Sequence, residues 1–458
     1  MQIQSMETER TTAVAVLPDD LLAGILGRLP ARSLAASRCV CTSWRGLVDA
    51  RRLLLPHLLP HSVRGLFLNY YDHETPHFFA HPAMPTNQGS QIDGSFQFVV
   101  AEGKEALCYH LVLDQCNGLL LFGYIGTSLW LCNPATRWWT RLPERSDGDW
   151  RRRPFVVFDP AVSPHWEVML APHEPREERH PDGIPSEKDG AWRRTMEWPP
   201  AAWTWHVFSS ATMRWEERVF VRQGEAAGTV GSLLDLDEHF CGECRYGAYC
   251  NGALYMHCRG EYVSRLSLST NTYQVIKSPI DVATESQNQF LQSFIGRSQH
   301  GVYFAALGDE GQLRVWILKE EACERLETEW LLKHDRAVNP DEEQMQDDGP
   351  WIFDDYYDTA SADQGEESLE QRNMGWDSDN DNIVSSVEDE DHLHDNWHFF
   401  LGFHPYKEII FLEISCYTVA YHFNGTNKVQ YLGKLCPRSY NRGLYESFVY
   451  TPCRIRVV

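Results

Sequence analysis

Two cysteines of this sequence have a spacing that suits metal binding. Cys241 and Cys244 form a C-x-x-C pair, and Cys250 and Cys258 follow at short distances. Zinc needs four ligands that converge tetrahedrally, and a second C-x-x-C pair after a long spacer would be the stronger pattern. Because that second pair is missing, we interpret these cysteines as packed or loop thiols and keep a zinc site as the alternative.

A second candidate lies in an acidic stretch. Asp377, Asp379, Asp381 and Glu388 match the ligand spacing of a calcium-binding EF-hand loop, and Val384 stands at its apolar position. No exiting helix is predicted after Glu388, and a segment this rich in acids produces such spacing readily. We therefore expect no resident metal and no other cofactor, with calcium binding as the alternative.

Three histidines recur four residues apart, at His73, His77 and His81. On a helix this spacing would align them for a metal ion. Pro76 and Pro82 break any such helix, because proline lacks the N–H that the helix needs. These histidines are therefore predicted to lie in loops or strands.

Signatures of catalysis are missing from the sequence. It contains no G-x-S-x-G elbow, no P-loop, no H-E-x-x-H and no dinucleotide fingerprint after a strand. We expect no catalytic residue and no enzymatic activity, so the chemistry of this chain should be binding.

Charge is concentrated in one segment. The net charge is −23 over 458 residues. Residues 341–395 hold twenty Asp or Glu and one Arg, which gives −19, so the rest of the chain carries −23 − (−19) = −4. A nearly neutral remainder predicts no nucleic-acid surface. No apolar run approaches the roughly 20 residues that span a bilayer, so no membrane partner is expected either. Thirteen scattered cysteines suit reduced thiols in a cytoplasmic or nuclear protein.

The elements that could organise binding begin with a helical stretch near the N-terminus. Pro18, Asp19 and Asp20 suit a helix start. Leu21, Leu22, Ile25, Leu26 and Leu29 then fall at helical spacing, and Pro30 ends the helix. Two more short helices are predicted, with Ser33 or Ser37 and Thr42 or Ser43 as possible caps. Three short helices bury little area together, so the apolar stripe is expected to continue onto a partner.

This stretch resembles the F-box, and the resemblance implies a role. F-box helices dock on a Skp-type adaptor and, through it, on a cullin. By this resemblance, the residues expected at the adaptor interface or in its immediate support are Leu17, Pro18, Leu21, Leu22, Ile25, Leu26, Leu29, Pro30, Leu34, Val40, Cys41 and Trp44. Thr42 stands where the family often has a basic residue, which is a mild departure.

The remainder has the rhythm of short strands. Residues 117–143 and 251–279 share one plan of strand, turn, strand, turn and strand, each with an opening Asn-Gly and a closing Pro. Weaker copies begin at His300 and Lys407, and a fifth covers two segments separated by a polar loop over residues 173–200. Repeats of about 40 residues with three or four short strands are typical of β-propeller blades. The sequence predicts about six blades, with the strands after Arg64 and residues 445–458 sharing the closing blade.

This region is similar to the F-box-associated propeller that follows the F-box in many plant proteins, cereal ones in particular, on the basis of NGLLL, CNPATRWWTRLP and the blade rhythm. The predicted organisation is a flexible N-terminus (1–14), an all-α F-box module (15–60) and an all-β, propeller-like domain (63–458). An acidic and largely disordered insertion interrupts it (339–395). Within the insertion, residues 351–358 form an aromatic island that either binds a partner or folds back on the propeller.

The resemblance implies a substrate-recognition subunit of an SCF-type ubiquitin ligase, in which the F-box binds the adaptor and the propeller binds an unknown target protein. Two alternatives stay open: a propeller scaffold that is not assembled into a ligase, and a propeller-based enzyme.

Overall fold

The computed structural model divides the chain into two compact units, Met1–Pro60 and His61–Val458. No helix of the part described is both long and apolar enough to span a membrane. The structure describes residues 17–456 except 60, 82–91, 100–109, 124–127, 145–151, 177–190, 236–245, 260–261, 281–291, 309–310, 321–327, 342–343, 346–348, 354–375, 377–380, 385–397 and 436–442.

The first unit is helical, as the sequence predicts. It contains α1 (Asp19–Leu26), α2 (Ala31–Ser37), α3 (Thr42–Ala50) and the short α4 (Leu55–Leu58). Pro18 and Pro30 stand immediately before α1 and α2, where a missing N–H costs no helical hydrogen bond. The predicted caps of the second and third helices are wrong: Pro30 precedes α2, and Cys41 caps α3.

A small apolar core joins α1, α2 and α3. Leu26, Leu34, Leu47 and Val48 are buried at its centre. Leu22, Leu29 and Trp44 pack against it while staying half-buried. Only one side of α1 packs in this core. The other apolar residues of α1 therefore stay exposed to solvent.

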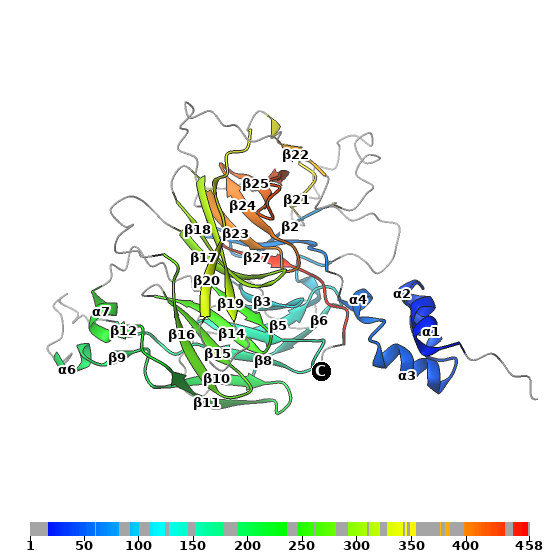
Figure 1. The fold of residues 1–458 in the computed structure, drawn as a ribbon, viewed down its shortest axis with the longest axis horizontal. Coiled ribbons are helices and arrows are strands. Elements are labelled where there is room, and N and C mark those ends of the chain that lie inside the picture. Colours follow the sequence, from blue (N-terminus) through cyan, green and yellow to red (C-terminus); the bar gives the residue numbers. More distant parts are fainter. Residues whose placement is uncertain are drawn as a thin grey trace, which may run out of the picture. The chain divides into compact units, whose positions relative to one another are not determined.

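Strands dominate the second unit (Figure 1). Among the described residues they form six antiparallel blades, which we number from the closing blade and list from the inner strand outward. Blade 1 contains β27 (Leu444–Tyr450), β1 (Gly65–Tyr70), β2 (His77–Ala80) and β21 (Ile352–Phe353). Blade 2 contains β3 (Leu111–Cys116), β4 (Leu119–Gly123), β5 (Leu129–Asn133) and β6 (Trp138–Arg141). Blade 3 contains β7 (Pro154–Phe158), β8 (Trp166–Leu170), β10 (Ala202–Ser209) and β11 (Arg214–Gln223).

Blades 4 to 6 follow the same plan. Blade 4 contains β13 (Gly247–Cys250), β14 (Ala253–Cys258), β15 (Tyr262–Ser267) and β16 (Thr272–Lys277). Blade 5 contains β17 (Gln292–Ser298), β18 (Gly301–Leu307), β19 (Gln312–Glu320) and β20 (Thr328–Ala337). Blade 6 contains β23 (His398–Phe403), β24 (Ile409–Ile414), β25 (Tyr417–His422), β26 (Val429–Lys434) and β22 (Ile383–Val384).

The inner strands close into a ring. Each of β27, β3, β7, β13, β17 and β23 contacts the next, and β23 contacts β27 again. This closed order of six blades is the β-propeller that the sequence predicts. Blades 3 and 4 are also joined at their outer strands, where Val221–Gln223 of β11 pairs in parallel with Thr272–Gln274 of β16.

The closing blade combines both ends of the propeller sequence, as predicted. β27 pairs antiparallel with β1, with Phe448 opposite Phe67 and Tyr450 opposite Gly65. Pairing between the two ends of the propeller sequence closes the ring of blades.

Asn-Gly turns connect inner and second strands in two blades. Asn117 and Gly118 have φ of 46° and 86°, and Asn251 and Gly252 have φ of 48° and 78°. Positive φ at both central residues is the type I′ geometry that fits the twist of a tight hairpin. Asn424-Gly425 also lies in a hairpin, between β25 and β26, although its loop is longer.

Parts of the acidic insertion belong to the propeller. β21 pairs with β2, and β22 pairs with β26. Trp351 is buried against Phe79 and Phe411. The fold-back interpretation therefore holds for Trp351–Phe353, while residues 354–358 of the aromatic island lie outside the described residues.

The polar loop over residues 173–200 carries short elements where it is described. α6 (Ala191–Arg194) precedes β9 (Glu197–Trp198), which pairs with β12 (Gly228–Thr229) next to α7 (Val230–Leu234). Trp198, Trp203 and Trp205 are buried in one core cluster with β10. These large aromatic side chains therefore serve the packing of the blade.

Candidate functional site

An exposed apolar surface lies on the helical unit. Leu17, Leu21, Ile25 and Val40 expose 46%, 59%, 52% and 65% of their area. Pro18, Pro30 and Cys41 are exposed as well. Leu21 and Ile25 are four residues apart and therefore share a face of α1. Exposed large apolar side chains grouped in this way suit a protein partner.

The other predicted interface residues serve the core of the helical unit. Leu26 and Leu34 expose 1% and 0% of their area and support the helices from inside. Leu22, Leu29 and Trp44 are half-buried, so each has a side facing the core and a side still open to solvent. The sequence motif alone did not separate these supporting residues from the exposed ones.

Cys41 has a structural role that the sequence did not indicate. Its Sγ accepts a hydrogen bond from the backbone N–H of Trp44 at 3.4 Å, which caps α3. Cys41 therefore both caps α3 and belongs to the exposed residues described above.

Ion pairs tie the helices together next to this set. Arg51 donates to Asp20 at 2.5 Å and so connects α3 to α1. Arg38 binds Asp49 at 2.8 Å. These pairs are solvent-exposed and contribute little stability each, so their main effect is on the charge around the apolar residues.

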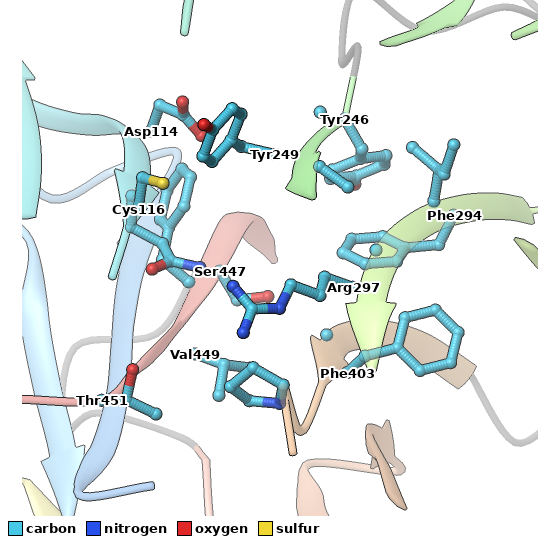
Figure 2. A pocket seen from close by; sticks show the side chains of 18 of the residues that line it. Asp114, Cys116, Tyr246, Tyr249, Phe294, Arg297, Phe403, Ser447, Val449 and Thr451 are labelled. Atoms are coloured by element: carbon cyan, nitrogen blue, oxygen red, sulfur yellow. The ribbon is translucent and has the colours of Figure 1, made fainter. Parts of the chain in front are cut away.

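A cavity runs along the ring of inner strands in the propeller. It has a volume of about 100 Å3, and all six inner strands or the residues next to them line it. Figure 2 shows residues such as Asp114, Tyr249, Arg297 and Ser447 around the same space. A volume of this size holds a few water molecules or one small chemical group.

One part of the cavity contains a charged cluster. Arg153, just before β7, makes two hydrogen bonds to the carboxylate of Glu446 on β27, one of them at 3.1 Å. Asp114 of β3 accepts a hydrogen bond from the Val156 N–H at 2.6 Å. Burial raises the pKa of Asp114 to about 7, and burial also raises the pKa of Glu446, with Arg153 opposing that increase. No motif or spacing in the sequence indicated this cluster.

A separate cation lies in the same cavity. The Arg297 Nη1 of β17 donates to Asn117 Oδ1 at 3.2 Å, and its guanidinium lies 5.3 Å from the ring centroid of Tyr406. Burial lowers the pKa of the nearby His61, and the charge of Arg297 lowers it further. The ring of His61 stacks on Tyr406 with 3.9 Å between the ring centroids. Neither Arg297 nor Asn117 was marked as a site residue in the sequence, because their spacing shows no motif.

Most residues of the metal sites considered from the sequence are not among the described residues. Cys241, Cys244, Asp377, Asp379 and Glu388 lie outside the described residues. Cys250 and Cys258 are buried cysteines of β13 and β14. Within the described part of the chain, no group of three or more His, Cys, Asp or Glu side chains could hold a metal ion.

Two of the histidines that were predicted to lie outside a helix, His73 and His77, are close together in the structure. His73 Nδ1 and His77 Nε2 lie 2.6 Å apart, a hydrogen-bond distance that leaves no room for an ion between them. His73 follows β1 and His77 begins β2, so the turn between these strands makes the contact.

Comparison with known protein families identifies the helical unit. The family model described as F-box domain matches residues 16–55. This chain carries an F-box domain. The matched range contains α1, α2, α3 and the first residue of α4, and it includes all twelve residues predicted from the motif.

Curated relatives agree with this assignment. At1g32420 and At1g11270, both named as F-box proteins of Arabidopsis thaliana, are 26% identical to this chain over 166 and 132 residues. These segments cover 34% and 28% of this chain and 50% and 39% of the relatives. The chain thus matches about half or less of their length. They support a plant F-box protein with a C-terminal β domain.

One solved structure that resembles this chain is YCF48 bound to a D1 peptide. The alignment covers 87% of this chain and 92% of that structure, with 8% identity and a TM-score of 0.31. A likeness of this degree carries no argument about function. The propeller assignment rests instead on the closed ring of inner strands in this chain.

Proposed function

We propose that this F-box protein is the substrate-recognition subunit of an SCF-type E3 ubiquitin ligase. In this proposal the F-box domain binds a Skp-type adaptor and, through it, a cullin, while the propeller binds the target protein. We further propose that it acts in the cytoplasm, the nucleus or both, in keeping with the absence of disulfides among the cysteines that the structure describes.

The observation that carries the proposal is the exposed apolar set of the F-box domain. Leu17, Leu21, Ile25 and Val40 remain open to solvent while Leu26 and Leu34 fill the core. F-box domains generally bind Skp-type adaptors, and burial of these four side chains would supply apolar area to that interface.

The proposed mechanism is positional. A receptor that holds its target near a charged ubiquitin-conjugating enzyme raises the effective concentration of the target lysine. No side chain of the receptor needs to form or break a bond, so the chain is proposed to be non-catalytic.

The test is copurification of the full chain with a Skp-type adaptor and a cullin. We expect a one-to-one complex of the chain with the adaptor that recruits the cullin. A chain that binds the adaptor but never recruits the cullin would favour the scaffold alternative. A chain that binds neither protein would overturn the proposal.

A further inference from the structure

Arg297 is positioned for binding in the propeller cavity. It lies near the end of β17, and Figure 2 shows its side chain reaching toward the middle of the cavity. Ser447, Val449 and Thr451 of the closing blade and its end lie around the same space. A long cationic side chain directed into a central cavity is available to a ligand that enters there.

The guanidinium of Arg297 is only partly satisfied within the propeller. Its one hydrogen-bond acceptor among the described residues is the neutral Asn117 Oδ1, and its other contact is the ring face of Tyr406. No described carboxylate lies within ion-pair distance of it. A guanidinium carries five N–H donors, so several donors remain for a ligand.

Both neighbours of Arg297 are themselves held in place. Asn117 lies in the type I′ turn at φ 46°, and its Nδ2 donates to the Phe158 carbonyl at 2.6 Å. This bond directs the Asn117 Oδ1 toward Arg297. Tyr406 is stacked against His61 with an interplanar angle of 13°. The site is therefore preorganised, which lowers the entropic cost of binding.

The remaining charges of the cavity are already compensated. Arg153 is engaged by both carboxylate oxygens of Glu446. Asp114 accepts a hydrogen bond from the backbone N–H of Val156. Burial raises its pKa to about 7, so the carboxyl group is partly protonated at neutral pH. Arg297 is thus the cation of this cavity that an incoming anion would meet without displacing an existing pair.

The geometry favours a carboxylate over a phosphate. A single guanidinium fork matches the two oxygens of one carboxylate, and such pairs are frequently bidentate. A phosphate monoester carries nearly two negative charges at neutral pH and calls for a second cation. The other cation that lines the cavity, Arg153, is occupied by Glu446.

We propose that Arg297 binds the carboxylate of an Asp or Glu side chain that the target protein inserts into the propeller cavity. This assignment rests on the proposed function in that the ligand is a protein target. The cavity of about 100 Å3 admits one such side-chain group and excludes a folded element, so the acidic residue would lie in an extended or loop segment.

The experiment uses the immobilised full chain and two pools of short peptides. In one pool a central Glu is flanked by randomised uncharged residues, and in the other Gln replaces that Glu. We expect the Glu pool to be retained on the order of tenfold more than the Gln pool, since a hydrogen bond to a charged group is worth at least this factor. Arg297→Gln should abolish the preference. Arg214→Gln, which makes the same change at an exposed position of β11, should leave it intact.

A second variant covers the case in which Arg297→Gln fails to fold. Asn117→Asp places a carboxylate beside the guanidinium and should also abolish the preference, because the internal acid occupies Arg297. Equal retention of the two pools by the native chain, or an unchanged preference in both variants, would overturn the proposal. Stronger retention of a matched phosphoserine pool would overturn the carboxylate assignment.

Adaptor binding is measured on the same preparations. A chain that binds the adaptor but shows no preference for Glu overturns only the assignment of Arg297. A chain that prefers Glu but binds no adaptor keeps the cavity site and overturns the proposed ligase role.

Discussion

Removing two exposed side chains of α1 should weaken adaptor binding without unfolding the F-box domain. Leu21 and Ile25 expose 59% and 52% of their area and are not part of the helical core. Complete burial of such a side chain contributes about 1.5–3 kcal/mol. Since only the exposed part is newly buried, and alanine keeps the Cβ, we expect about 1 kcal/mol from each residue, or about 2 kcal/mol for Leu21→Ala with Ile25→Ala.

The assay is isothermal titration calorimetry of the full-length double variant with a Skp-type adaptor. A loss of about 2 kcal/mol corresponds to roughly a 30-fold weaker Kd. Alanine is the best helix former, so the helical circular dichroism signal should not decrease. Val162→Ala is the matched control, because Val162 is a 79% exposed apolar residue of the propeller unit.

Two results would refute the reasoning. An unchanged Kd would mean that this face of α1 does not contact the adaptor. A weaker Kd accompanied by loss of helical signal would mean that Leu21 and Ile25 act through folding, contrary to their exposure.

Three other predictions concern the core, a turn and a buried acid. Leu26→Ala should destabilise the F-box helices by about 2–5 kcal/mol, which hydrogen exchange of α1 to α3 in the full chain would detect as lost protection; unchanged protection would contradict the core assignment. Gly118→Ala should lower the stability of the propeller, measured by urea unfolding, more than Gly252→Ala does. Both glycines have positive φ, but only the new Cβ of residue 118 would lie 2.5 Å from the backbone N of Cys453. Equal losses of stability in the two variants would contradict this reason. Burial raises the pKa of Glu413 from 4.5 to about 7, so its stabilising contribution is present below pH 4.5 and is lost as pH rises through 7. Glu413→Gln should therefore flatten the decrease in stability between pH 5 and pH 8 in urea titrations, by up to about 3 kcal/mol, and an unchanged pH slope would contradict the assignment.

Local signals account for most of what the sequence predicted. The F-box residues follow one another within 28 positions of Leu17 to Trp44, so spacing alone identifies them. The turns at Asn117-Gly118 and Asn251-Gly252 are dictated by two residues that tolerate positive φ. The closing blade was predictable because the N-terminal and C-terminal strands each lacked a complete blade of their own.

Contacts between distant parts of the chain were beyond the sequence. Arg153 and Glu446 are 293 residues apart, and only ring closure brings them together. Arg297 and Asn117 are 180 residues apart and meet for the same reason. The two-residue strands β21 and β22 are too short for a hydrophobic period to reveal them.

Exposure was also hidden within the motif. Leu21 and Leu26 are equivalent as apolar residues in the sequence, yet one is 59% exposed and the other 1%. The angle at which α3 packs on α1 determines which side of the stripe is covered, and that angle depends on tertiary packing rather than on α1 alone.

The most direct test of the proposed role is reconstitution of the full chain with a Skp-type adaptor, a cullin and its ubiquitin-conjugating enzyme. We expect the native chain to join the cullin through the adaptor and the Leu21→Ala, Ile25→Ala variant to join it far less at the same concentration. A native chain that stays separate from the adaptor at micromolar concentrations of both would contradict the account.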